Sequence, residues 1–154
     1  MENIYKARIN RAIDHIESNL ENAFTLEELA REAGFSKFHF SRIFKALVGE
    51  TPFQFILRVR LEKSAALLVM NTKESITGIA FTCGFTDISV FSRNFKSYFK
   101  KSATQYRNEK SNINQADSNT QQTGTTTSMY FCHDLQTIKW RTNMKLNKSV
   151  EVRE

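Results

Sequence analysis

Residues 29–55 read LAREAGFSKFHFSRIFKALVGETPFQF, and residues 79–106 repeat this pattern as IAFTCGFTDISVFSRNFKSYFKKSATQY. The offset is 50 positions at the glycine (34 to 84) and 51 positions after it (40 to 91). The matched pairs are Gly34-Phe35 with Gly84-Phe85, Phe40-Ser41-Arg42 with Phe91-Ser92-Arg93, and Phe44-Lys45 with Phe95-Lys96. Because duplicated units set the architecture of a chain, we expect two copies of one substructure.

Each copy predicts two short helices joined by a tight turn. In the first copy, Leu26 and Leu29 share one face of a helix, and Gly34 can adopt the left-handed backbone that ends it. Ser36 is placed to cap the next helix, which we expect over 36–48. The outer face of that helix carries Lys37, Phe38, Ser41, Arg42 and Lys45.

Two helices joined by a glycine turn, the second with a basic outer face, are the layout of a helix-turn-helix unit for the major groove of DNA. The alternative is an αα-hairpin with a solvated cationic face. Matching arginines and lysines in both copies favour DNA binding, with recognition helices at about 36–48 and 87–99. We therefore predict an all-α fold of two such units joined by a long central helix.

The charge distribution agrees with a polyanionic partner. The 154 residues carry a formal charge of +6. Residues 1–107 hold 16 Lys and Arg against 11 Asp and Glu, a net charge of +5, while the remaining residues hold 6 against 5. The positive excess therefore lies in the duplicated part, as expected for a domain that binds phosphate backbones.

Cysteines, histidines and apolar runs give no sign of a cofactor or a membrane. Cys83 and Cys132 form no ligand cluster with His15, His39 or His133 at a spacing typical of metal sites. The start, MENIYKAR, has no apolar signal sequence, and no run approaches the ~18 apolar residues of a membrane span. We expect no cofactor, no metal, no membrane contact and a cytoplasmic location.

Two further helices complete the first unit. Residues 4–20 place Ile9, Ile13, Ile16 and Leu20 on one stripe. Thr25 and Glu28 form a capping box, as do Thr51 and Gln54 with Pro at the first helical position. From the second box we expect a helix to about Met70, with one apolar stripe of Phe53, Ile56, Leu57, Leu61, Ser64 and Leu68. Arg58, Arg60 and Lys63 either touch phosphate or are solvated.

The second unit follows the same scheme. Ser75 caps a short helix, Gly84 ends it, and either Thr86 or Asp87 caps the second recognition helix. Its inward residues are Phe91, Phe95 and Phe99, and its outward residues include Ile88, Ser89, Val90, Arg93 and Lys96. Ser102 and Gln105 predict a closing turn that ends near Arg107.

The remainder of the chain changes character. Residues 108–128 hold one Ile, one Ala and no aromatic residue, which predicts a disordered polar linker. Residues 129–154 contain strand-like stretches but are too few for an independent core. They are either the truncated start of a second domain or a disordered extension.

The duplicated part resembles the DNA-binding domain of the AraC/XylS family of bacterial transcription regulators. The resemblance covers residues 8–107 and rests on LAREAGFSKFHFSRIFK, on Arg60-Leu61 with Leu67-Leu68, and on GFTDISVFSRNFK with Tyr106-Arg107. It implies seven helices and binding to promoter DNA as an activator or repressor, with activation the expected sign, and often with contact to RNA polymerase. The tail end SVEVRE loosely resembles the first strands of a GyrI-like domain, which would bind a small-molecule effector only if the chain continued.

The family resemblance also implies which residues read bases. In the first unit they are Phe38, Ser41 and Arg42, and in the second unit Ile88, Ser89, Val90 and Arg93. An arginine matches guanine O6 and N7 bidentately, a serine takes either a base edge or a phosphate, and Val90 suits a thymine methyl group. For Ile88, base contact and packing on the preceding helix both remain open. Lys37, Lys45 and Lys96 are placed for phosphate.

Two departures from the family pattern bear on the second unit. The chain has Lys100 and Ala103 where the family usually has Gly and Pro, so Lys100 either adopts a left-handed backbone at a cost of about 1 kcal/mol or ends the helix differently. The outward residues of the second recognition helix are also more apolar than is usual in the family.

Two other classes of function compete with this interpretation. An enzyme would need a nucleophile with a base, a metal site or a phosphate-binding loop, and the sequence offers none of these patterns. A protein-interaction module would use the basic faces for an acidic partner and would show no preference among duplex sequences. DNA binding is the interpretation that also accounts for the duplication.

Overall fold

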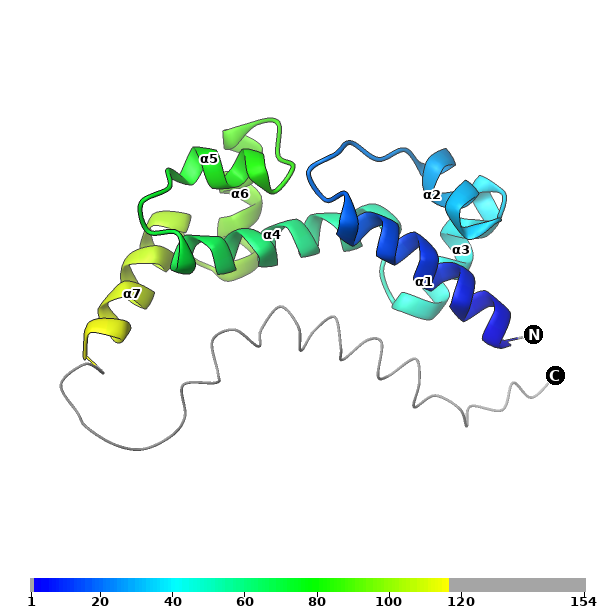
Figure 1. Cartoon of the computed structure of the whole chain (residues 1–154), viewed down its shortest axis with the longest axis horizontal. Helices are drawn as coiled ribbons and strands as arrows, with labels where there is room; N and C mark the ends of the chain where they lie inside the picture. The colour runs from blue at the N-terminus through cyan, green and yellow to red at the C-terminus, as the bar shows by residue number, and fades with distance from the viewer. Residues whose placement is uncertain (1, 117–154) are drawn as a thin grey trace.

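The computed structural model describes residues 2–116, and within this range the chain folds into seven helices, as predicted (Figure 1). They are α1 (Glu2–Ser18), α2 (Leu26–Ala33), α3 (Lys37–Val48), α4 (Pro52–Met70), α5 (Ile76–Thr82), α6 (Ile88–Phe99) and α7 (Ala103–Ala116). The predictions for residues 117–154, including the tail at 129–154, lie outside the described range.

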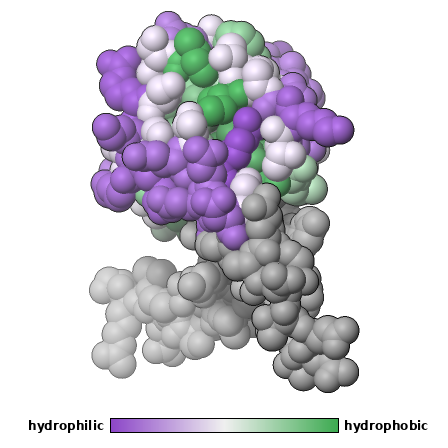
Figure 2. All heavy atoms as spheres, turned by 90° about the vertical axis from the view of Figure 1, so that its left-hand side faces the viewer, coloured by the Kyte–Doolittle hydropathy of each residue, from purple (hydrophilic) through white to green (hydrophobic). Residues whose placement is uncertain are grey.

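Helix α4 runs through the middle of the molecule and joins two groups of helices (Figure 1). The first subdomain consists of α1, α2, α3 and the N-terminal half of α4. The second subdomain consists of the C-terminal half of α4 with α5, α6 and α7. Seen from the end that carries α5 and α7, the surface is mostly hydrophilic, with a small hydrophobic area between polar side chains (Figure 2).

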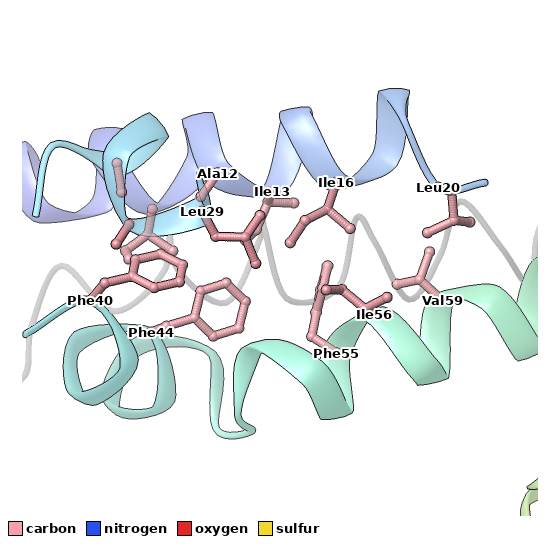
Figure 3. Close-up of a cluster of buried hydrophobic side chains, with 13 residues drawn as sticks. Ala12, Ile13, Ile16, Leu20, Leu29, Phe40, Phe44, Phe55, Ile56 and Val59 are labelled. Atoms are coloured by element: carbon pink, nitrogen blue, oxygen red, sulfur yellow. The ribbon is translucent and has the colours of Figure 1, made fainter. Parts of the chain in front are cut away.

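Each subdomain has a hydrophobic core of its own. In the first core the α1 stripe of Ile9, Ile13, Ile16 and Leu20 is buried as predicted. Figure 3 shows Ile13, Ile16 and Leu20 pointing toward the phenylalanines of α3 and toward the start of α4. The second core gathers Leu61, Ala65, Leu68, Ile79, Ala80, Cys83, Phe85, Phe91, Phe95 and Ala103. The duplication in the sequence therefore corresponds to two separately packed units.

The local signals at the helix ends are confirmed, with the exception of the cap expected from the Ser36 side chain. Thr25 with Glu28 and Thr51 with Gln54 form complete capping boxes. Gly34 and Gly49 have left-handed backbones at the ends of α2 and α3. Ser36 occupies the capping position of α3, but its side chain makes no capping hydrogen bond.

The prediction for the buried face of α4 was wrong in part. Phe53, assigned to the buried stripe, is 51% exposed, whereas Phe55 is fully buried. Helix α4 does not bury one continuous stripe, because its first half faces one core and its second half faces the other. Phe55, Ile56 and Val59 lie in the first core, and Leu61, Ala65 and Leu68 lie in the second core.

The closing helix is longer than the sequence analysis indicated. We expected a turn ending near Arg107, but α7 continues to Ala116, so the first nine residues of the expected linker at 108–128 are helical. The capping box of Ser102 and Gln105 is confirmed by hydrogen bonds of 3.0 and 3.2 Å. The Nζ atom of Lys101 pairs with the Glu109 carboxylate, which adds support beyond the expected end.

An arginine binds the carboxyl end of the first helix in each subdomain. Arg60 of α4 donates from Nε to the Leu20 carbonyl (3.0 Å) and from Nη2 to the Asn22 carbonyl (2.6 Å). Arg107 of α7 donates from Nε to the Leu68 carbonyl (3.2 Å) and from Nη2 to the Glu74 carbonyl (2.8 Å). Carbonyls near a helix end lack partners within the helix, and a cation is favourable there.

The glycine turn of the second unit packs directly against the Arg60 junction. Gly84 has a φ of +89°, and a Cβ atom added to it would overlap the Leu20 carbonyl oxygen and lie 2.8 Å from Arg60 Nε. The two subdomains therefore touch across this turn as well as along α4. Gly49 has nearly the same φ, +91°, but nothing lies within 4 Å of its added Cβ.

These two glycines allow backbone strain to be separated from packing. We predict that Gly49→Ala destabilises the domain by about 1–2 kcal/mol, the cost of a left-handed backbone. Gly84→Ala should cost a further ~1–3 kcal/mol, because the new methyl group is forced into the Leu20 and Arg60 contact. Urea unfolding followed by circular dichroism measures both values. Equal losses would contradict the close contact between the subdomains.

Lys100 adopts the left-handed backbone that its position requires. It ends α6 with a φ of +61°, and it is the one non-glycine residue with positive φ within residues 2–116. A left-handed backbone costs a lysine about 1–2 kcal/mol, and glycine avoids this cost.

We predict that Lys100→Gly stabilises the domain by about 0.5–1 kcal/mol in urea unfolding, since the gain exceeds the added entropy of the unfolded chain. The control is Lys96→Gly inside α6, which should destabilise by about 1 kcal/mol. A loss of stability in Lys100→Gly would mean that the lysine side chain contributes more than its backbone costs.

Candidate nucleic-acid interface

Helix α3 presents one apolar face inward and one basic face outward. Phe40 and Phe44 are fully buried, and their rings pack on each other with centroids 5.5 Å apart. On the opposite face, Phe38 is 77% exposed, and Arg42 and Lys45 are also exposed. Helical spacing thus places the predicted base-reading and phosphate-binding residues of the first unit on the solvent side, with Ser41 half-buried beside them.

The N-terminal end of α3 is anchored on α1 by an aromatic group that the sequence analysis missed. The ring of Phe35 stacks on Tyr5 (5.7 Å between centroids) and meets His39 edge-on (5.2 Å). Arg8 lies over the same Phe35 ring and donates to the Gly34 carbonyl at 3.3 Å. Tyr5 and Arg8 lie far from Phe35 in the sequence, so no local pattern indicated these contacts between α1 and the start of α3.

Lys37 differs from the other predicted phosphate contacts. Its Nζ atom pairs with Glu27 of α2 at 2.7 Å and lies 5.5 Å from the centroid of the Phe38 ring. The hydrogen bond to Lys37 lowers the pKa of the exposed Glu27 carboxyl. A phosphate would have to compete with Glu27 for this ammonium. Lys45 and Lys96 are exposed, and no ion pair is recorded for either within residues 2–116.

Helix α6 repeats the arrangement of α3 with a stronger cap. Asp87, one of the two predicted candidates, caps the helix by accepting from Ser89 N (2.6 Å) and Val90 N (3.2 Å). The backbone donors of Val90 and Ser89 lower the pKa of the Asp87 carboxyl, so it stays ionised at neutral pH. The cap fixes the first turn of α6, where three of the predicted base readers, Ile88, Ser89 and Val90, lie.

The outward face of α6 carries four of the predicted site residues in the open. Ser89, Arg93 and Lys96 are exposed, and Val90 is 40% exposed. Ile88 is half-buried and packs against the second core. This placement favours the packing interpretation for Ile88, which the sequence analysis had left equal to base contact. Its role in base reading, like that of the other site residues, stays a prediction.

Arg58 and Arg60 are neither solvated nor free for phosphate, so both alternatives given for them were wrong. Arg60 binds the carbonyls of Leu20 and Asn22, as described above. Arg58 pairs with Glu50 and Glu62, and its guanidinium lies over the Phe55 ring. The i, i+4 spacing of Arg58 and Glu62 was a signal for an ion pair that the sequence analysis did not use.

The described residues contain neither a metal-binding cluster nor a helix that could span a membrane. In residues 2–116, no three His, Cys, Asp or Glu side chains are grouped so that they could hold a metal ion. Burial raises the pKa of the Cys83 thiol to about 11, which leaves it a protonated, packed side chain. In this same part of the chain, no helix is both long and apolar enough to cross a membrane. The exposed basic faces of α3 and α6 are therefore the main candidate site, and they define a tandem helix-turn-helix protein.

Comparison with known proteins identifies the family. A family model described as a helix-turn-helix domain matches residues 29–109. The chain is 36% identical over 100 residues to an uncharacterized HTH-type transcriptional regulator of Haemophilus influenzae, covering 65% of this chain and 33% of that protein. It is 34% identical over 99 residues to the multiple antibiotic resistance protein MarA of Salmonella typhimurium, covering 64% and 77%.

Solved structures give the same result. An AraC-type transcriptional regulator from Chromobacterium violaceum matches with a TM-score of 0.63 and 27% identity, covering 68% of this chain and 93% of that chain. The DNA-binding domain of AdpA, solved with a target DNA, matches with a TM-score of 0.63 and 25% identity, covering 66% and 91%. The chain belongs to the AraC/XylS family of helix-turn-helix transcription regulators. It spans about a third of the length of two curated relatives that it matches.

Proposed function

We propose that this chain regulates transcription by placing α3 and α6 in successive major grooves of one promoter site. The observation that carries the proposal is the pair of outward faces, each with an arginine at the matching position, Arg42 and Arg93, on helices attached to the same α4. The related AdpA domain, which was solved with a target DNA, supports duplex DNA as the partner.

The length of α4 agrees with this arrangement. Its 19 residues span roughly 28 Å at 1.5 Å per residue. One turn of B-DNA is about 34–36 Å, which is the separation of successive major grooves on one side of the duplex. Because the two recognition faces differ in sequence, one chain would bind an asymmetric site and would not need a palindrome.

The outward residues divide into two roles. Arg42 and Arg93 are the candidates for guanine, since a guanidinium donates to O6 and N7 together. Phe38, Ser41, Ser89 and Val90 surround them, and the two apolar members suit thymine methyl groups. Lys45 and Lys96 would neutralise phosphates, which adds affinity without sequence information.

The wider activity follows from these roles. We propose activation of transcription as the outcome, with RNA polymerase as a further partner and the cytoplasm as the location, because a promoter-binding protein acts where the chromosome lies. A relative of Staphylococcus xylosus, 30% identical over 99 residues, is named as a lactose operon transcription activator. We propose binding without catalysis, and a small-molecule effector only if a further domain follows.

The test is selection of preferred duplexes from a random pool, followed by titration of the selected and a scrambled duplex at about 0.15 M salt. A specific regulator should prefer the selected duplex by ~10³ or more. A ratio near one would contradict the proposal and would favour an acidic protein partner.

We predict that Arg42→Ala and Arg93→Ala each weaken binding to the selected duplex by about 1–3 kcal/mol, with little effect on the scrambled duplex. Lys45→Ala is the matched control, which should weaken both duplexes alike and lower the salt dependence. Fluorescence anisotropy at several salt concentrations measures all of these values. If Arg42→Ala weakened both duplexes equally, Arg42 would contact only the DNA backbone.

A further inference from the structure

A chain of polar contacts connects the C-terminal ends of the two recognition helices. Glu50 directly follows Gly49, which ends α3, and Tyr98 is the last residue but one of α6. Between them lie Arg58 and Glu62, two residues of α4 one helical turn apart. These four residues lie in different parts of the sequence, so only the folded structure reveals that their contacts are connected.

Each contact in the chain has the geometry of a normal hydrogen bond. Arg58 donates from Nε (2.9 Å) and Nη2 (2.7 Å) to Oε1 of Glu50. Its Nη1 atom lies 3.2 Å from both carboxylate oxygens of Glu62. The hydroxyl of Tyr98 then donates to Oε1 of Glu62 at 2.7 Å. One carboxylate therefore receives hydrogen bonds from α4 itself and from α6.

Partial burial distinguishes the two ion pairs of Arg58 from ordinary surface ion pairs, whereas Tyr98 at the end of the network is 41% exposed. The side chains of Arg58, Glu50 and Glu62 are 20%, 25% and 10% exposed. The Arg58 guanidinium also lies 5.2 Å above the centroid of the Phe55 ring, in the first core. Charge-assisted bonds of this kind are stronger than neutral ones, and removing one partner leaves a half-buried charge unsatisfied.

The two hydrogen-bond donors of the network, Arg58 and Tyr98, keep their protons at neutral pH. Partial burial and the hydrogen bond to Glu62 raise the pKa of the Tyr98 phenol to about 12, so Tyr98 remains a donor. Burial acts to lower the pKa of Arg58, but the hydrogen bond to Glu50 and the charge of Glu62 outweigh it.

The connection holds α6 at the end opposite the Gly84 turn. Gly84, four residues before α6, packs on the Leu20 carbonyl and on Arg60. Tyr98 fixes the other end of α6 to the same face of α4 that receives Glu50 from the end of α3. The hydrophobic cores attach α3 and α6 to α4 separately, each within its own subdomain, whereas these polar contacts link the ends of both helices to one another through Arg58 and Glu62.

We propose that Arg58, Glu62 and Tyr98 are positioning residues that fix the distance between the two recognition helices and thereby the number of base pairs between the two halves of the binding site. The hydrogen bonds among these residues do not depend on any function, whereas their consequence for DNA rests on the proposed function. One inserted base pair would move the second half-site by about 3.4 Å and by roughly a tenth of a turn. A hydrogen bond tolerates only a few tenths of an ångström, so α6 could not follow.

The test compares the selected duplex with duplexes in which one base pair is inserted or deleted between the half-sites. The native chain should lose at least about tenfold in affinity, the value of one base contact. Tyr98→Phe and Arg58→Met should bind the selected duplex within about threefold of the native chain but lose clearly less on the altered duplexes. Tyr5→Phe is the matched control, since it removes a hydroxyl from a ring that contacts Phe35 and His39.

A second measurement tests the connection without DNA. Positions 46 of α3 and 92 of α6, occupied by the exposed Ala46 and Ser92, are spin-labelled. Double electron–electron resonance then measures the distance between the two recognition helices. Cys132 is replaced by serine, and Cys83 is buried. We expect one narrow distance distribution in the native chain and in Tyr5→Phe, and a broader or displaced one in Tyr98→Phe.

The outcomes separate the inference from the proposed function. If the native chain prefers no duplex, the proposed function fails, and the label distances still decide whether the connection holds the helices. If the native chain tolerates the changed spacing, or if both variants keep the full spacing penalty and the native label distance, the inference is overturned.

Discussion

Helix α4 packs into two separate hydrophobic cores, one with each half of its length, and the rest of the structure depends on this double packing. Its first half supplies Phe55, Ile56 and Val59 to one core, and its second half supplies Leu61, Ala65 and Leu68 to the other. Neither subdomain can complete its core without α4, since burial of apolar area is the main driving force for folding. The two recognition helices are therefore attached to a shared structural element and not to a flexible linker.

Polar contacts convert this shared helix into a defined spacing. Arg60 joins α4 to the end of α1 beside the Gly84 turn, and Arg58 with Glu62 joins it to the ends of α3 and α6. Arginine suits both positions because its planar guanidinium donates in several fixed directions at once. The basic charge of the domain thus has two separate uses, one within the protein and one on the exposed faces.

The parts of the fold that sequence predicted are those governed by neighbouring residues. The capping boxes at Thr25 and Thr51, the left-handed Gly34 and the α1 stripe depend on spacing within one helix or turn, and all were confirmed. The single stripe assigned to α4 was wrong because burial there is set by two cores that lie far apart in the sequence. The end of α7 was missed because a polar helix beyond Arg107 has little local signal.

The candidate site shows the same division. Duplication and helical spacing correctly placed Arg42, Arg93, Lys45 and Lys96 on exposed faces. The sequence could not separate the two alternatives for Ile88, because its packing against the second core depends on the angle between helices. Arg58 was misjudged for a different reason, since its i, i+4 spacing to Glu62 was a local signal of the ion pair that was not used.

Protection of guanine N7 from methylation by dimethyl sulfate tests the central claim most directly, because N7 lies in the major groove. On a selected duplex, the account predicts two groups of protected guanines on one side of the duplex, with centres about 10 base pairs apart. A single protected group, or two groups on opposite sides, would contradict the claim that both recognition helices enter successive major grooves.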